Sequence, residues 1–167
     1  EMTLVANQQT PRLGILLPTR GILLKGETPP DLSPLFSLAQ QAEDAGLDSV
    51  WVGDSLVSKP RLEPLSTLAA VAMKTSRIKL GTAVVVVSER NPIILAKEVA
   101  TLDMYSGGRL LFGIGVGGHR EEAEILGADF PHRWTQGKEA IMAMKELWTR
   151  EESEYHGKYY DFPPVYC

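Results

Sequence analysis

Short apolar runs alternate with longer segments of mixed polarity along this chain of 167 residues. The runs are continuous rather than alternating in polarity, which is typical of strands buried on both faces of a sheet. Pro18 follows the first run and Gly53 ends the second, and both residue types interrupt strands. We predict four strands, at residues 13–17, 47–53, 77–87 and 110–114.

The segments between these runs have apolar residues every three or four positions, as on one face of a helix. Ser33 before Pro34 and Asn91 before Pro92 are expected helix N-caps, each followed by a first-turn proline. We predict helices at residues 34–45, 64–74, 92–102 and 135–149 and a small hairpin at 154–161. The late apolar residues that we expect in the core are Trp134, Ile141, Met144 and Trp148.

The predicted order is a strand and a helix repeated four times, which indicates an α/β protein with parallel strands and right-handed crossovers. Two architectures fit: a doubly wound open sheet, or part of an eightfold TIM barrel. A complete barrel takes about 250 residues, and four strands leave both sheet edges unpaired. On the barrel interpretation, residues 1–167 are one domain, an incomplete barrel of about four β/α units plus the hairpin. Such a chain is a fragment, a proteolysed product, part of a longer protein or half of an assembly.

Composition and charge narrow the class of protein. Hydrophobic residues make up 44% and charged residues 23%, as in globular proteins. The net charge of −4 lacks the basic footprint of nucleic-acid binding. We expect no membrane span, secretory signal or internal disulfide, since there is no long apolar run and Cys167 is the single cysteine. His132 and His156 lack ligand partners at close spacing, so no metal site is expected. We expect a cytoplasmic protein.

Four glycines, at 113, 115, 117 and 118, lie at the exit of the last predicted strand. A glycine allows a flat ligand or another backbone to approach closely. The pattern superficially resembles a dinucleotide-binding fingerprint, but that motif follows the first strand and opens directly into a helix. Here it follows the fourth strand, and a polar segment comes next. We therefore favour a glycine run at the mouth of a barrel, with close packing as the alternative.

Two polar residues at predicted strand ends are candidates for chemistry. Asp54 follows the second strand, at the end where α/β proteins bind ligands, and could accept a hydrogen bond from a bound ring; a loop carboxylate is the alternative. His119 follows the glycines and could donate a proton or contact an anion, although a plain loop residue is the commoner case. Glu121, Glu122 and Glu124 are interpreted as an exposed helix start.

From about residue 12 onwards, a series of short motifs follows in the order typical of a known protein family. The motifs are LGILLP at 13–18, AEDAGLDSVWVGD at 42–54, IKLGTAV at 78–84, NPIILAKEVATLD at 91–103, SGGRLLFGIGVGG at 106–118, EEAEILG at 121–127 and YHGKYYD at 155–161. Together they resemble the bacterial luciferase-like monooxygenase superfamily, and within it the oxidoreductases that use the deazaflavin coenzyme F420.

This resemblance implies the N-terminal half of a TIM barrel that binds a flavin-type ring at the carboxyl ends of its strands. Asp54 matches an acid beside the ring. Ala83 and Val84 match a bulge with a non-prolyl cis peptide that backs the ring. The residues that match the floor near the ring are Gly115, Val116 and Gly117.

The chain departs from the family at two positions where some relatives carry an acid-base residue. Several relatives have a histidine where this chain has Ser55, and some have a glutamate where it has Gly118. The proton donor therefore stays open.

The resemblance favours F420-dependent hydride transfer involving an unknown small organic substrate. The alternatives are an FMN-dependent, two-component monooxygenase and a non-catalytic half-barrel assembly module that dimerises through its open edges. We expect a homodimer.

Overall fold

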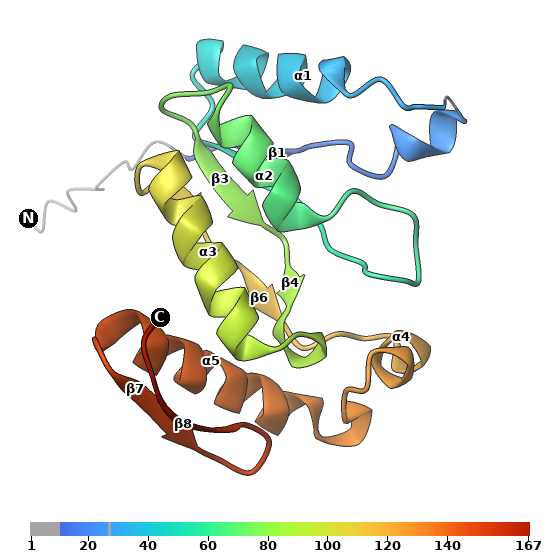
Figure 1. The fold of residues 1–167 in the computed structure, drawn as a ribbon. Coiled ribbons are helices and arrows are strands. Elements are labelled where there is room, and N and C mark those ends of the chain that lie inside the picture. Colours follow the sequence, from blue (N-terminus) through green and yellow to red (C-terminus); the bar gives the residue numbers. More distant parts are fainter. Residues whose placement is uncertain (1–10, 27) are drawn as a thin grey trace, which may run out of the picture.

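The computed structural model describes residues 11–26 and 28–167. Its main sheet is parallel, with the order β1-β2-β3-β5. Figure 1 shows the whole chain, with β1 and β3 of this sheet labelled. A second parallel pair, β4 with β6, lies beyond the ends of β3 and β5. The strands of these two sheets are β1 Gly14–Leu16, β2 Ser49–Val52, β3 Lys79–Thr82, β4 Val85–Val86, β5 Leu110–Leu111 and β6 Ile114–Gly115.

Helices connect the successive strands of the main sheet, and an antiparallel hairpin of β7 and β8 follows the last long helix. The α-helices are α1 Ser33–Asp44, α2 Pro64–Ala72, α3 Pro92–Ser106, α4 Arg120–Ile125 and α5 Arg133–Thr149. The 3-10 helices are η1 Leu23–Lys25, η2 Val87–Glu89 and η3 Phe130–His132, and the hairpin strands are β7 Ser153–His156 and β8 Asp161–Val165. The predicted β/α order and the hairpin are confirmed.

Three local predictions need correction. The third predicted strand is divided into β3, β4 and η2, and the fourth into β5 and β6. Ser33 is not an N-cap: it is the first residue of α1, and the Asp31 carboxylate accepts from its backbone N–H at 2.9 Å. Asn91 does cap α3, because its side-chain oxygen accepts from the backbone of Ile93 and Ile94.

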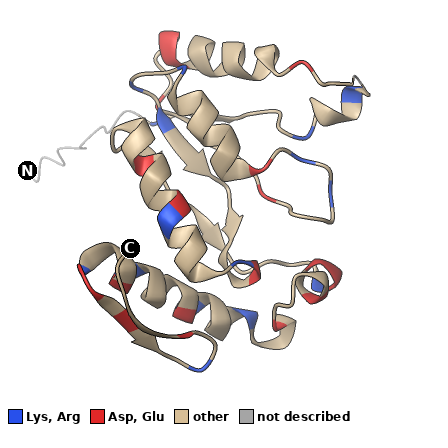
Figure 2. Ribbon diagram, in the orientation of Figure 1, with Lys and Arg blue, Asp and Glu red and all other residues tan. Residues whose placement is uncertain are grey.

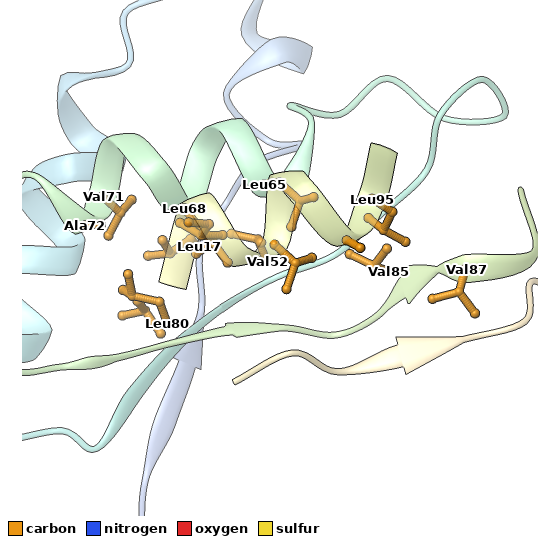
Figure 3. Close-up of a cluster of buried hydrophobic side chains, with 14 of the residues drawn as sticks. Leu17, Val52, Leu65, Leu68, Val71, Ala72, Leu80, Val85, Val87 and Leu95 are labelled. Carbon is orange, nitrogen blue, oxygen red and sulfur yellow. The ribbon is translucent and has the colours of Figure 1, made fainter. Parts of the chain in front are cut away.

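The core lies between the sheet and the helices that follow its strands. Because each strand pairs beside the preceding one, right-handed crossovers place the helices on one face of the sheet. Figure 3 shows leucine and valine side chains from strands and helices meeting in this layer. Its fully buried members include Leu17, Val50, Val52, Leu68, Val71, Leu80, Val85, Leu95 and Met144.

The opposite face of the sheet is more open than the apolar runs predicted. Leu16, Leu111 and Ile114 are exposed, because within the described residues the sheet is not closed into a barrel. The expectation that Trp134 belongs to the core is also wrong, since it is 70% exposed. Trp148 is exposed too, although its indole N–H donates to the Ala96 carbonyl, and Met144 is buried as predicted.

Charged side chains fasten the amino ends of the strands to the helices. Glu43 of α1 accepts hydrogen bonds from the backbone N–H groups of Ser76, Arg77 and Ile78, just before β3. Arg109, just before β5, donates five hydrogen bonds to neighbouring oxygen atoms. This end of the sheet therefore satisfies its buried polar groups internally.

Charges of both signs are spread along the chain, without a long basic stretch (Figure 2). None of the helices in the described residues is long and apolar enough to cross a membrane.

Candidate functional site at the carboxyl ends of the strands

The third strand is interrupted where it reaches the carboxyl edge of the sheet. The peptide bond between Ala83 and Val84 is cis, as the family resemblance implied. The backbone N–H of Ala83 still donates to Val52 at 2.7 Å, and that of Val85 donates to Gly113 at 2.9 Å. The side chain of Val84 is left 42% exposed between these two anchored positions. An apolar side chain is thus presented at the edge where parallel sheets bind ligands.

The glycines of the run at 113–118 have two different structural roles. A Cβ on Gly113 would collide with the Thr82 carbonyl oxygen, so this glycine serves close packing between strands. A Cβ on Gly115 would lie 2.6 Å from Cγ2 of Val84, and one on Gly117 would lie 2.7 Å from Oε1 of Glu89. The two later glycines therefore let side chains from the neighbouring strand end approach the backbone.

Val116 and an adjoining pocket border this surface. A Cβ on Gly137 would lie 2.6 Å from Cγ1 of Val116, so the Val116 side chain packs against α5. Its carbonyl accepts from the Ser88 hydroxyl at 3.0 Å. An apolar pocket of about 360 Å³ opens beside it. The residues that line this pocket are Val87, Ile114, Gly115, Val116, Trp134, Gly137, Lys138, Ile141 and Met142.

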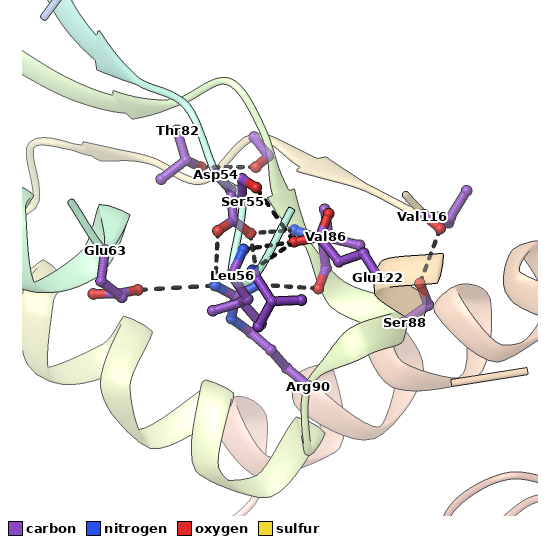
Figure 4. A network of polar contacts seen from close by, with 12 residues as sticks. Asp54, Ser55, Leu56, Glu63, Thr82, Val86, Ser88, Arg90, Val116 and Glu122 are labelled. Atoms are coloured by element: carbon purple, nitrogen blue, oxygen red, sulfur yellow. Dashed lines mark hydrogen bonds and ion pairs between the residues drawn. The ribbon is translucent and has the colours of Figure 1, made fainter. Parts of the chain in front are cut away.

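Asp54 is buried in an ion pair rather than presented to a ligand. Its side chain is 1% exposed, and its two oxygens accept from Arg90 at 2.6 and 3.0 Å. It also accepts from the backbone N–H of Val86 at 2.9 Å. Figure 4 shows Asp54, Arg90 and Val86 together. Asp54 therefore positions the segment after the cis peptide, and its side chain is too buried in this structure for the expected direct hydrogen bond to a ring.

Glu122 corrects the interpretation of an exposed acidic helix start. It is 5% exposed, and one of its oxygens accepts from the backbone N–H groups of Leu56 and Val57 at 2.7 and 3.0 Å. The Ser58 hydroxyl donates to the other oxygen at 2.8 Å. Burial raises the pKa of Glu122, but the hydrogen bonds from Val57, Ser58 and Leu56 outweigh it and lower the pKa to about 2. Glu122 holds the loop after β2 against α4, while Glu121 and Glu124 are exposed as predicted.

Glu89 is a site residue that sequence reasoning missed. It is 8% exposed and lies at the end of η2, two residues beyond the predicted strand end. Burial raises its pKa to about 7, and the charges of Glu122 and Asp54 act in the same direction while Arg90 opposes them. The sequence held a signal for Glu89, because Glu89 follows a predicted strand just as Asp54 does. That position was the reason for selecting Asp54.

Two other residues frame the mouth. The Arg61 guanidinium packs against Gly53 at the end of β2, where a Cβ would collide with it. Its Nε is buried and has no hydrogen-bond partner among the described residues. His119 is exposed at the N-cap position of α4, and its side chain forms no capping hydrogen bond. The structure brings Val84, Gly115, Gly117 and Glu89 together and leaves His119 at the rim.

These features define a β/α-barrel protein, represented here by an open set of its strands, with a candidate ligand site at their carboxyl ends. The chain belongs to the luciferase-like monooxygenase family, whose sequence pattern matches residues 11–166.

Relatives and solved structures agree with this membership. An F420-dependent glucose-6-phosphate dehydrogenase of Amycolatopsis mediterranei is 35% identical over 137 residues, which are 76% of this chain and 41% of that protein. The crystal structure of monooxygenase RslO1 from Streptomyces bottropensis superposes with a TM-score of 0.83 at 26% identity, covering 93% of this chain and 48% of that one.

An F420-dependent secondary alcohol dehydrogenase in complex with an F420-acetone adduct gives a TM-score of 0.70 at 25% identity. That match covers 80% of this chain and 43% of the dehydrogenase. The chain therefore spans about two fifths to one half of the length of these proteins.

Proposed function

We propose that the protein carrying this chain is an F420-dependent oxidoreductase acting on a small organic substrate, and that residues 1–167 form one domain, the N-terminal half of its barrel. The observation that carries the proposal is the surface formed by the exposed Val84, after the cis peptide, against the side-chain-free Gly115. The similarity to F420-dependent dehydrogenases supports the choice of cofactor.

The residues at this surface fit a planar ring. Gly115 and Gly117 have no side chains of their own, so Val84 and Glu89 pack directly against the backbone there, and Val84 offers an exposed apolar contact to the ring. We assign the holding of the ring to Ala83, Val84, Gly115, Val116 and Gly117, with Asp54 acting indirectly through Val86 and Arg90.

A bound deazaflavin supplies two-electron hydride chemistry, and the protein's part is to orient the ring and exclude water. Val84 and the neighbouring apolar pocket exclude water from one side of the surface. The Asp54–Arg90 ion pair fixes the backbone of Val86, so the segment that carries Val84 is held from both ends.

An FMN-dependent, two-component monooxygenase is the second candidate. The likeness to monooxygenase RslO1 favours it, and the same flat surface suits the FMN ring. A third candidate is a non-catalytic half-barrel that assembles through its open face, which the exposed Leu16, Leu111 and Ile114 favour. The homodimer and the cytoplasmic location remain part of our proposal.

Fluorescence titration of the protein with F420 and with FMN tests these alternatives. We expect saturable binding of F420 that is tighter than that of FMN. Val84→Asp is expected to weaken this binding at least about tenfold, because a carboxylate would be desolvated beneath the ring. Met73→Asp is the control, since Met73 is also exposed but ends α2 near the amino end of β3. Binding of neither cofactor would overturn the proposal, and tighter FMN binding would favour the monooxygenase.

A further inference from the structure

Glu89 lies on the mouth, against the exit of the glycine run. Its Oε1 lies 2.7 Å from where a Gly117 Cβ would be, so the carboxyl group packs against the backbone of the glycine run. Ser55 and Gly118 bring no acid or base to this edge. Glu89 is thus a buried acid in contact with the proposed floor of the site.

The Glu89 carboxyl group differs from its acidic neighbours because it has no internal partner. Asp54 is paired with Arg90, and Glu122 accepts backbone hydrogen bonds from the loop after β2. No hydrogen bond or ion pair to the Glu89 carboxyl group is formed within residues 11–26 and 28–167. Partial burial removes water from the charged form of such a group and so favours its protonated form.

The charges around Glu89 come from three elements. Asp54 lies after β2, Glu122 lies on α4, and Arg90 follows η2 directly. Burial and the two carboxylates raise the pKa of Glu89 to about 7, against the opposing effect of Arg90. An acid-base group is most effective when its pKa lies near the working pH.

We propose that Glu89 is the acid-base group of this mouth, and that it exchanges a proton with a ligand seated against Gly115 and Gly117. The nature of that ligand rests on the proposed function. In one direction, the O–H bond of Glu89 breaks and its proton goes to an oxygen or nitrogen of the ligand, leaving a carboxylate. In the other direction the ligand returns the proton, and Glu122 and Asp54 favour this return by repelling the carboxylate.

The first test needs no ligand. In protein labelled with ¹³C at glutamate side-chain carboxyls, we expect one carboxyl signal to titrate with a midpoint of about 7. Glu89→Gln should remove this signal, and Glu121→Gln should leave it, because Glu121 is exposed on the same helix as Glu122. A Glu89 signal that titrates near the ordinary 4.5 would overturn the proposal.

The second test uses F420 as the probe in the same labelled protein. We expect bound F420 to raise the midpoint of Glu89 by excluding water from the carboxyl group. By linkage, each unit of that shift makes binding about tenfold tighter at pH values below the midpoint than above it. F420 also ionises, but its own effect on binding is present with both proteins and cancels when Glu89→Gln is compared with the unsubstituted protein. The variant should lack the change in affinity across the Glu89 midpoint.

The outcomes separate this inference from the proposed function. Suppose that F420 binds, that it leaves the Glu89 midpoint unchanged, and that Glu89→Gln has the same pH dependence of affinity as the unsubstituted protein. The inference then fails while the proposed function stands. If neither F420 nor FMN binds, the proposed function fails. A midpoint of about 7 lost in Glu89→Gln would then still support Glu89 as the proton-holding group of the mouth.

Discussion

Two ionisable residues of nearly equal burial lie at opposite ends of the same parallel sheet. Arg109, at the amino end, is 9% exposed and donates five hydrogen bonds. Glu89, at the carboxyl end, is 8% exposed and has no internal partner in the described part of the chain. The two ends of the sheet also differ in strand geometry. The strands are regular at their amino ends, whereas β3 and β5 are interrupted at the carboxyl end, where the cis peptide and the glycines lie.

This difference separates stability from function within one sheet. At the amino end, polar groups are satisfied by the protein itself, so removing one leaves its partners unpaired. At the carboxyl end, the acid without an internal partner and the exposed Val84 beside Gly115 are features that a ligand would complete. In β/α barrels generally, residues at the carboxyl ends of the strands form the active site, and residues at the amino ends contribute to stability. Substitutions at the two ends should therefore affect different measurements.

The largest effect on folding is expected from Arg109→Met. Loss of the guanidinium leaves the buried carbonyl groups of Ala72, Thr75 and Ile78 without this donor. At about 1–3 kcal/mol for each of these three acceptors, we expect a loss of at least about 3 kcal/mol in the free energy of unfolding. Urea denaturation measures it. Arg12→Met is the matched control, because the Arg12 side chain is 85% exposed and should change stability little; equal losses in both variants would contradict the comparison.

Glu122→Gln is expected to have the next largest effect. The pKa of Glu122 in the folded protein is about 2, below its ordinary 4.5, so its stabilisation is complete above about pH 4.5 and is lost as pH falls towards 2. We expect the neutral amide to lower stability by about 3 kcal/mol at neutral pH and to flatten this acid-dependent loss. Urea midpoints between pH 7 and 3 test it. Glu121→Gln should retain the full pH dependence; if both variants behave alike, the assignment to Glu122 is wrong.

Gly115→Ala is expected to affect folding least and binding most. The added Cβ would lie 2.6 Å from Val84 Cγ2, so the valine side chain has to move. We expect about 1 kcal/mol of destabilisation from this overpacking and roughly tenfold weaker F420 binding, measured by fluorescence. Gly118→Ala provides the control, since nothing lies within 4 Å of its would-be Cβ. Unchanged binding in Gly115→Ala would remove Gly115 from the site.

The order of elements could be predicted from the sequence because it depends on local periodicity and end signals. Asn91 with Pro92 marked the start of α3 correctly, since the capping residue and the proline act within one turn. The division of the third strand could not be read from the apolar pattern. Residues 83–87 are apolar throughout, whether they continue the strand or bulge from it.

The site was predicted only in part because burial depends on contacts distant in sequence. Val84 was located through the family resemblance. The later glycines were located through their place at the exit of a predicted strand, and the resemblance then gave them their role. Glu122 looked like an ordinary acidic helix start, yet its partners are more than sixty residues away, in the loop after β2. Glu89 becomes buried because Gly117, on another strand exit, leaves room for it. The burial of these two residues has no local signature, although the place of Glu89 just after a predicted strand does.

Hydrogen–deuterium exchange of the protein with and without F420 tests the central claim most directly. We expect F420 to slow exchange in residues 83–87 and 113–118, at the carboxyl ends of the strands. Exchange in residues 72–80 and 106–110 should stay unchanged because they lie at the amino ends of the strands, away from the proposed ring. Glu43 already accepts from the amides of Ser76, Arg77 and Ile78 there. Protection confined to the amino ends, or absent from both segments at saturating F420, would contradict the account.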